Sequence, residues 1–187
     1  MRRQTVERAI QGDHDAFTEL ASASMDRQFA IATLILRDVD RAQDAVQEAL
    51  VSAWRDVRAL RDPEAWDAWL HRLTVRACYR LAASQRRRDL VELHMMPDPM
   101  PDRSTDFSLS VAERDRMERE IGRLSLDQRA VLVLHFYADL TLEQVADILG
   151  IPIGTAKSRL HYGSQALRET MPDRPTVPSG QVGERTA

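Results

Sequence analysis

The feature that most constrains the fold of this chain lies over residues 140–168, where two helical patterns are separated by a glycine. Leu142 and Val145 begin an apolar pattern with spacings of three and four, which defines one face of a short helix. Gly150 ends this pattern, at a position where glycine adopts the left-handed conformation that terminates many helices without steric cost. Pro152 then suits the first turn of a second helix. The spacing predicts a helix-turn-helix.

The second helix of this motif has features that favour DNA binding. Such a helix enters the major groove and presents its N-terminal residues to bases and phosphates. Hydrogen-bond donors gather at its start here, which an ordinary helical hairpin does not need, although the spacing alone fits a hairpin equally well. The candidate DNA-contacting residues of the motif are Thr141, Pro152, Gly154, Thr155, Lys157, Ser158, Arg159 and His161.

The N-terminal half also has a helical composition. Gly12 is its only glycine and no alternating strand pattern is present, so an all-α fold is expected. Apolar residues from position 17 to 35 suggest two helices, and residues 38–57 suggest a third with Trp54 in its buried stripe. A fourth helix is expected to begin near Pro63.

The middle and the end of the chain differ from the helical parts. Alternating prolines and acidic residues indicate a flexible linker, and the apolar-poor end indicates disorder. Helices are expected over 110–123 and over 126–137, with Ser125 as an N-cap. The predicted organisation is two small helical domains, over 1–88 and 110–171, joined by a linker over 89–109 and followed by a tail over 172–187.

An acidic strip is predicted on the third helix. Asp40, Asp44 and Glu48 recur every four residues with Gln47 beside them, opposite the apolar face. The simpler interpretation is a solvated surface. The alternative is a docking surface for a basic partner helix, whose orientation charge complementarity would set.

The fourth helix is predicted to carry the opposite charge. Arginines recur every four residues along it, and like charges at this spacing destabilise an isolated helix, so a polyanion is the expected partner. Trp69 is expected in the core, whereas Trp66, nearer the preceding loop, is the better candidate for stacking on unpaired bases. The candidate nucleic-acid contacts of this half are Arg61, Trp66, Arg72, Arg76, Arg80, Arg86 and Arg87.

Composition excludes several classes of protein. A net charge of -3 argues against a protein that coats nucleic acid without selectivity. Cys78 is the only cysteine, so no intramolecular disulfide or cysteine-based zinc site is expected, and a cytoplasmic location fits. No apolar run suits a membrane span or a signal peptide. The histidines lack metal-binding spacing and no glycine-rich phosphate loop is present, so no catalytic residue, metal or cofactor is expected.

Several segments resemble one family, the extracytoplasmic-function group of bacterial sigma factors, which are dissociable RNA polymerase subunits that choose promoters. The run AQDAVQEAL at 42–50 and the run AWR at 53–55 resemble sigma region 2.2. The run AWLHRL at 68–73 resembles the start of the region 2.4 helix. Residues 124–137 and 150–160 resemble sigma region 4.

The resemblance implies partners for each surface. Core RNA polymerase would bind Asp44, Gln47 and Glu48 through a coiled coil of its largest subunit. The loop over 58–64 and the fourth helix would open and read the −10 promoter element, and the second helix of the C-terminal motif would read the −35 element. Many relatives are covered by an anti-sigma factor, which is a further candidate partner. Where many relatives carry asparagine on the fourth helix, this chain has Arg76, so the preferred −10 base is not implied.

Two other classes of function compete with this one. A self-sufficient helix-turn-helix regulator would use its N-terminal half for sensing or dimerisation, but a sensor would not need the arginine-rich fourth helix. A protein-interaction module that has lost DNA binding fits the sequence after position 160, where HYGSQ replaces the arginines of many relatives. Few phosphate contacts, and a shallow salt dependence of −35 binding, are therefore expected.

Overall fold

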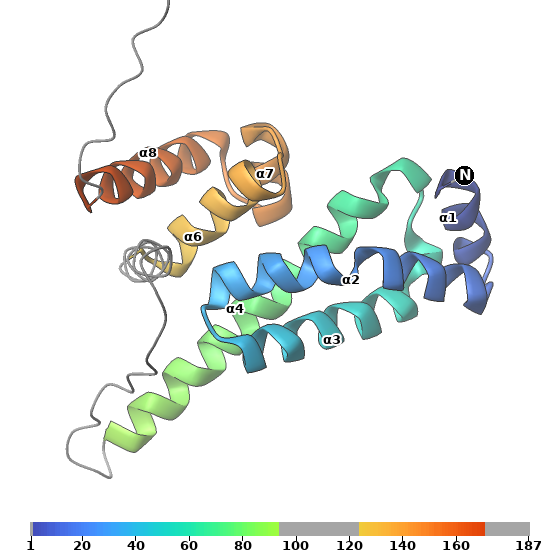
Figure 1. Ribbon diagram of the computed structural model, residues 1–187, viewed down its shortest axis with the longest axis horizontal. Coiled ribbons are helices and arrows are strands. Elements are labelled where there is room, and N and C mark those ends of the chain that lie inside the picture. The colour runs from blue at the N-terminus through green and yellow to red at the C-terminus, as the bar shows by residue number, and fades with distance from the viewer. Residues whose placement is uncertain (1, 94–123, 171–187) are drawn as a thin grey trace, which may run out of the picture.

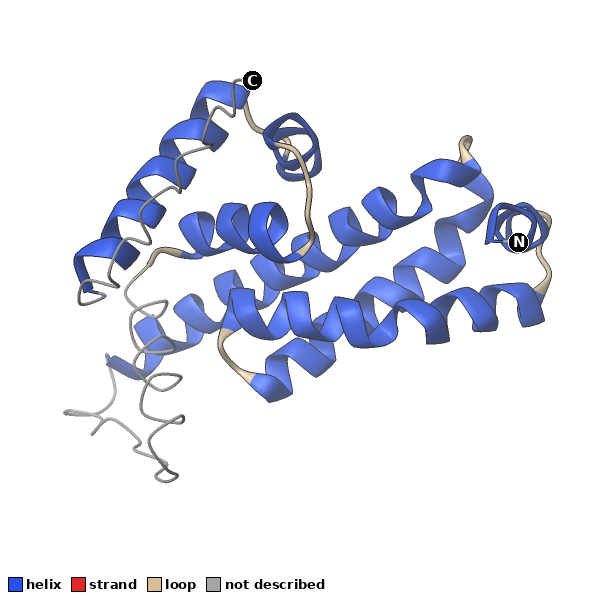
Figure 2. Ribbon diagram, turned by 45° about the horizontal axis from the view of Figure 1, so that its top comes forward, coloured by secondary structure: helices blue, strands red, loops and turns tan. Residues whose placement is uncertain are grey.

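The computed structural model describes residues 2–93 and 124–170, and within these ranges every regular element is helical (Figures 1 and 2). The elements are α1 (Arg2–Ile10), α2 (His14–Leu36), α3 (Val39–Asp56), 3-10 turns at Val57–Ala59 and Pro63–Ala65, α4 (Trp66–Leu93), α6 (Leu126–Leu132), a π-helical turn (Val133–Tyr137), α7 (Leu142–Leu149) and α8 (Ile153–Thr170). The all-α prediction is confirmed.

Some predicted boundaries differ from the structure or lie outside it. The helix α4 continues to Leu93, beyond the predicted start of the linker at residue 89, because no proline or glycine interrupts it before Pro97. The rest of the predicted linker, the helix expected over 110–123 and the tail over 172–187 lie outside the described residues.

The N-terminal half is a bundle in which α2, α3 and α4 lie side by side and α1 packs at the end where α2 begins (Figure 1). The prediction of two helices between positions 17 and 35 is wrong, since α2 is one continuous helix. Asp13 caps its start by accepting a hydrogen bond from the Ala16 amide, and Arg37 ends it in a left-handed conformation. No residue within that span breaks a helix, so packing on α3 and α4 keeps it intact.

Two tryptophan predictions are also wrong. Trp66 is only 2% exposed, because at the start of α4 it packs in a buried cluster with Phe17 of α2 and next to the ring of Trp69. It is therefore not available to stack on unpaired bases. Trp54 is 41% exposed instead of buried, since small residues such as Ala53 fill the closely packed stripe of α3. Its ring makes an edge contact with that of Phe17.

The C-terminal half forms the predicted helix-turn-helix. Thr141 caps α7 in a reciprocal capping box with Gln144, and Ser125 does the same for α6 with Gln128. Gly150 ends α7 with a φ of 65°, the left-handed conformation expected from the sequence. These local signals, which predicted the element ends, are confirmed.

The two halves share one hydrophobic core. Helices α6 and α7 lie against α2 and α4 (Figure 2). Ile31 and Cys78 from the N-terminal half belong to the same buried cluster as Val131 and Ile148 from the C-terminal half. Burial of this kind is the main stabilising contribution to a fold, so the described parts form one body rather than two separate units.

A polar triad lies inside the N-terminal bundle. The buried side chain of Gln28 contacts His71 Nδ1 at 3.0 Å through its Nε2 and accepts a hydrogen bond of 2.9 Å from Thr74 through its Oε1. Gln28 Oε1 also lies 3.2 Å from His71 Nδ1, so the amide offers a partner to either tautomer of the neutral ring. Burial is the main cause that lowers the pKa of His71 to about 4, and the nearby charge of Arg27 adds to it.

Because His71 is buried as the neutral form, we expect the unfolding free energy to fall in mild acid. The unfolded chain binds a proton near the ordinary histidine pKa of 6.5, whereas the folded chain resists protonation down to about 4. The contribution of neutral His71 to the unfolding free energy is therefore complete above pH 6.5. It decreases as the pH falls from 6.5 to about 4. We expect the wild type to lose about 2 kcal/mol of unfolding free energy between pH 7 and pH 5 from this source.

Urea denaturation at both pH values measures this loss. The variant His71→Asn keeps a hydrogen-bonding group near the Nδ1 position and cannot titrate, so it should lose less stability between the two pH values, whatever its stability at pH 7. An equal loss in the wild type and the variant would contradict the assignment.

Candidate docking face and nucleic-acid interface

The acidic strip lies on the outer side of α3. Asp40, Asp44 and Gln47 are exposed, so their side chains are available to a partner. Glu48 is half-buried, and its Oε1 forms an ion pair of 2.9 Å with Arg80 Nη2 of α4. The strip is therefore open at its N-terminal end and partly neutralised where it meets α4.

Two apolar side chains that the sequence analysis missed extend this strip. Val51 is 44% exposed and Trp54 is 41% exposed. Positions 40, 44, 47, 51 and 54 follow spacings of four and three, which place them on one side of α3. The same spacing is present in the sequence, but the apolar pattern of residues 38–57 predicts Trp54 in the core. We call these five residues the α3 face. It combines charge at one end with an exposed aromatic anchor at the other.

The arginines of α4 differ in how they are engaged. Arg76, Arg86 and Arg87 are exposed, as is Arg61 in the loop before α4. Arg72 is two-thirds buried, and its Nη2 donates to Asp147 Oδ2 at 2.6 Å and to the Asp147 backbone carbonyl at 3.1 Å.

Arg80 is exposed but paired with Glu48, as described above. The arginine line is therefore continuous on α4, with two of its members already bound to carboxylates.

A groove of about 630 Å³ lies between α4 and α7. Arg72, Arg76 and Arg80 line one side of it, and Asp147 lies on the other. Two of these arginines, Arg72 and Arg80, are already paired with Asp147 and Glu48, so carboxylates offset part of the positive charge of the groove.

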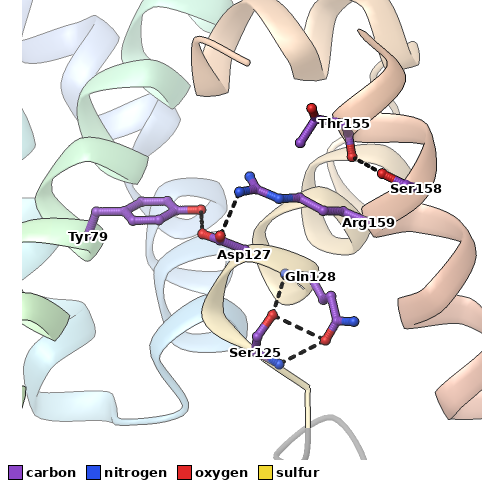
Figure 3. A network of polar contacts seen from close by, with 7 residues as sticks. All are labelled: Tyr79, Ser125, Asp127, Gln128, Thr155, Ser158 and Arg159. Carbon is purple, nitrogen blue, oxygen red and sulfur yellow. Dashed lines mark hydrogen bonds and ion pairs between the residues drawn. The ribbon is translucent and has the colours of Figure 1, made fainter. Parts of the chain in front are cut away.

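The start of α8 presents most of the predicted contacts outward. Pro152, Gly154, Lys157, Ser158 and His161 are exposed and Thr155 is half-buried. The hydroxyl of Ser158 contacts the backbone carbonyl of Thr155 (Figure 3) and that of Gly154, both within its own helix. The hydroxyl of Thr141 caps α7.

Arg159 is directed inward rather than outward. Its Nη2 lies 2.6 Å from Asp127 Oδ2 of α6, and its side chain is 26% exposed. The other oxygen of Asp127 accepts a hydrogen bond of 2.7 Å from the Tyr79 hydroxyl of α4 (Figure 3). Burial is the main cause that raises the pKa of Tyr79, so its hydroxyl stays protonated and remains a donor. Nη2 of Arg159 is therefore engaged by Asp127, contrary to the prediction of a side chain directed to an outside partner.

The described residues contain no cluster of three or more side chains suited to hold a metal ion. Among the same residues, none of the helices is both long enough and apolar enough to cross a membrane.

Comparison with known proteins identifies both halves. Family models of sigma-70 region 2 and sigma-70 region 4 match residues 20–88 and 121–169. The ECF RNA polymerase sigma factor SigK of Mycobacterium sp. (strain KMS) is 32% identical over 176 residues, which cover 90% of this chain and 88% of the relative. The ECF RNA polymerase sigma factor SigM of Mycobacterium tuberculosis (strain H37Rv) is 31% identical over 153 residues, which cover 80% of this chain and 74% of the relative.

A solved structure supports the fold. The sigma factor RpoE from Bartonella quintana, in complex with the anti-sigma factor NepR, matches with a TM-score of 0.67 and 23% sequence identity. The match covers 82% of this chain and 95% of that chain. The arrangement of helices is therefore shared.

The turn of the helix-turn-helix yields a stability prediction. A Cβ at Gly150 would meet no atom within 4 Å, so only the positive φ penalises a side chain there. We expect Gly150→Ala to lower the unfolding free energy by about 1–2 kcal/mol. Gly154→Ala is the matched control, because its Cβ would also meet open space and its φ is not positive. That control should be neutral or stabilising in the same denaturation experiment. A neutral Gly150→Ala would contradict the proposed role of the glycine.

Proposed function

The chain belongs to the extracytoplasmic-function RNA polymerase sigma factors, and we propose that its α3 face binds core RNA polymerase while α4 and α8 contact promoter DNA. As a sigma factor it directs core polymerase to promoters in transcription initiation. This membership favours the sigma-factor interpretation over a self-sufficient regulator. We infer that the protein acts by binding alone, in the cytoplasm, with no catalytic step of its own.

The observation that carries this proposal is the opposite charge of two neighbouring helices. The α3 face is acidic and ends in an exposed tryptophan, and α4 carries a line of arginines. Exposed aromatic side chains surrounded by polar residues often supply most of the binding energy of a protein interface. Charges at the rim mainly guide association and orientation. A basic coiled coil of the polymerase would satisfy both parts of the α3 face.

The arginines of α4 supply the contacts to the −10 region in this proposal. Because Trp66 is buried, phosphate neutralisation by Arg76, Arg86 and Arg87 replaces base stacking on that ring as the source of affinity. Such contacts stabilise a separated strand that follows the surface of α4, and they favour opening by binding the open form more tightly than the duplex.

The start of α8 supplies the contacts to the −35 element. Lys157 and His161 are exposed on the same helix, and Gly154 leaves space for close approach of the DNA backbone. An anti-sigma factor is a further candidate partner, since the RpoE protein of similar fold binds one named NepR.

Charge reversal on the α3 face tests the docking proposal. We expect Asp40→Arg/Asp44→Arg to lower both core polymerase binding and runoff transcription from genomic promoter fragments by more than tenfold, because both carboxylates would then repel a basic partner. Glu48 is left intact, because replacing it would also break its ion pair with Arg80. The control is Asp26→Arg, which changes an exposed carboxylate of α2 outside the α3 face. Unchanged core binding by the double variant would rule out docking through this face.

A further inference from the structure

We propose that Tyr162 of α8, with its ring held against that of His161, recognises the methyl group of a thymine in the −35 element. This inference rests on the proposed contact of α8 with the −35 element, and it adds the chemical group that is recognised. It also gives a role to the run HYGSQ at 161–165, which the proposed function leaves unexplained.

Tyr162 is the most exposed of the described large apolar side chains of α8. It is 61% exposed, compared with 37% for Ile153 at the start of the helix. A spacing of four residues places it after Ser158 on the outward side of the helix, and His161 beside it is also exposed. A partner that binds the exposed residues at the start of α8 therefore also meets the ring of Tyr162.

The glycine after Tyr162 fixes which side of α8 faces outward. Gly163 is buried, and a Cβ there would lie 2.9 Å from Leu132 Cδ1 and 3.4 Å from Gln128 Cβ of α6. The two helices therefore approach each other closely at this point, and Ala156 is buried on the same side of α8. Because successive residues of a helix are about 100° apart, Tyr162 stays outside this contact.

Fewer polar side chains of α8 are available to recognise bases than the sequence predicts. The Ser158 hydroxyl contacts backbone carbonyls of its own helix, and Arg159 is paired with Asp127 of α6 (Figure 3). Lys157 is exposed, but its charge suits a phosphate in any sequence as well as a guanine. The aromatic pair at 161 and 162 therefore remains as the apolar surface with which α8 distinguishes bases.

An aromatic ring at this place matches the apolar group that base edges present in the major groove. Of the four bases only thymine carries a methyl group there, and apolar side chains recognise it by contact. The rings of His161 and Tyr162 lie edge to face, with their centroids 5.4 Å apart and their planes at 72°. This arrangement is favourable between aromatic rings, so it orders the Tyr162 ring before DNA binds and lowers the entropy that binding costs.

Replacement of thymine by uracil tests this proposal, because uracil keeps the base pair and lacks only the methyl group. A promoter that responds to the full chain is first selected from genomic fragments by runoff transcription with core polymerase. Each thymine of its −35 element, on either strand, is then replaced in turn. At one position or more the wild type should lose about fourfold in transcription at a subsaturating concentration, as expected for one methyl group that loses an apolar contact.

Variants of Tyr162 assign this methyl effect to the ring. Tyr162→Ala should transcribe the thymine template less than the wild type does, and should transcribe the thymine and uracil templates equally. Tyr162→Phe keeps the ring and should keep the fourfold effect. The matched control is Tyr137→Ala, which removes a 47% exposed tyrosine of the same half that lies outside α8, and it should also keep the effect. Unchanged binding of each variant to core polymerase checks that it is folded.

Three results would overturn the proposal. One is a wild type that is unaffected by uracil at every −35 position, and another is a Tyr162→Ala variant with the same uracil effect as the wild type. The third is loss of the effect in Tyr162→Phe, which would assign recognition to the hydroxyl instead of the ring.

Lys157→Ala distinguishes these results from a failure of the proposed function. If α8 contacts the −35 element, this variant should lower transcription by the same factor on the thymine and uracil templates, because it removes a charge and no methyl contact. Unchanged transcription by both Lys157→Ala and Tyr162→Ala would instead contradict the proposed contact of α8 with DNA.

Discussion

The packing of α2 and α4 against α6 and α7 is the constraint on which the rest of the structure depends. It buries Ile31 and Cys78 with Val131 and Ile148 in one core. It also decides which charged side chains face solvent, because Arg72 and Arg159 are drawn toward carboxylates while Asp40 and Asp44 stay exposed. This packing therefore leaves the α3 face exposed, while two of the proposed DNA-contacting arginines are engaged by carboxylates.

Asp127 shows how a single side chain couples the elements of this fold. It belongs to α6, yet its two oxygens bind Tyr79 of α4 and Arg159 of α8 (Figure 3). The pair with Arg159 lies within the C-terminal half and can persist when the halves separate, whereas the Tyr79 contact cannot. Separation of the halves therefore changes the environment of a residue in the DNA-contacting helix. Electrostatic contacts of this partly exposed kind are individually weak, so several together with the apolar core are needed to hold the two halves together.

Local chemistry explains what the sequence could predict. Ser125, Thr141 and Gly150 mark helix ends through hydrogen bonds and backbone conformations that involve only their neighbours. Such signals do not depend on the rest of the fold, so the predicted ends of α6 and α7 agree with the structure. The burial of Trp66 and the exposure of Trp54 depend instead on how α2 packs against α3 and α4, a long-range arrangement that periodicity does not contain. The same is true of the hydrogen bonds between the two halves, which join residues far apart in the chain.

The most direct test of how this packing limits the DNA contacts is to prevent the two halves from separating. Arg27 of α2 donates a hydrogen bond of 2.7 Å to the Ala138 carbonyl, so cysteines placed at Arg27 and at Asp139, which lies beside Ala138 and is exposed, can be joined by a reducible bifunctional maleimide. The native Cys78 should not react, because burial raises its pKa to about 12 and keeps the thiol protonated. The joined chain should still bind core polymerase but give no runoff transcription until a reductant cleaves the linker, whereas a monofunctional maleimide should have no effect. Full transcription by the joined chain would contradict the account.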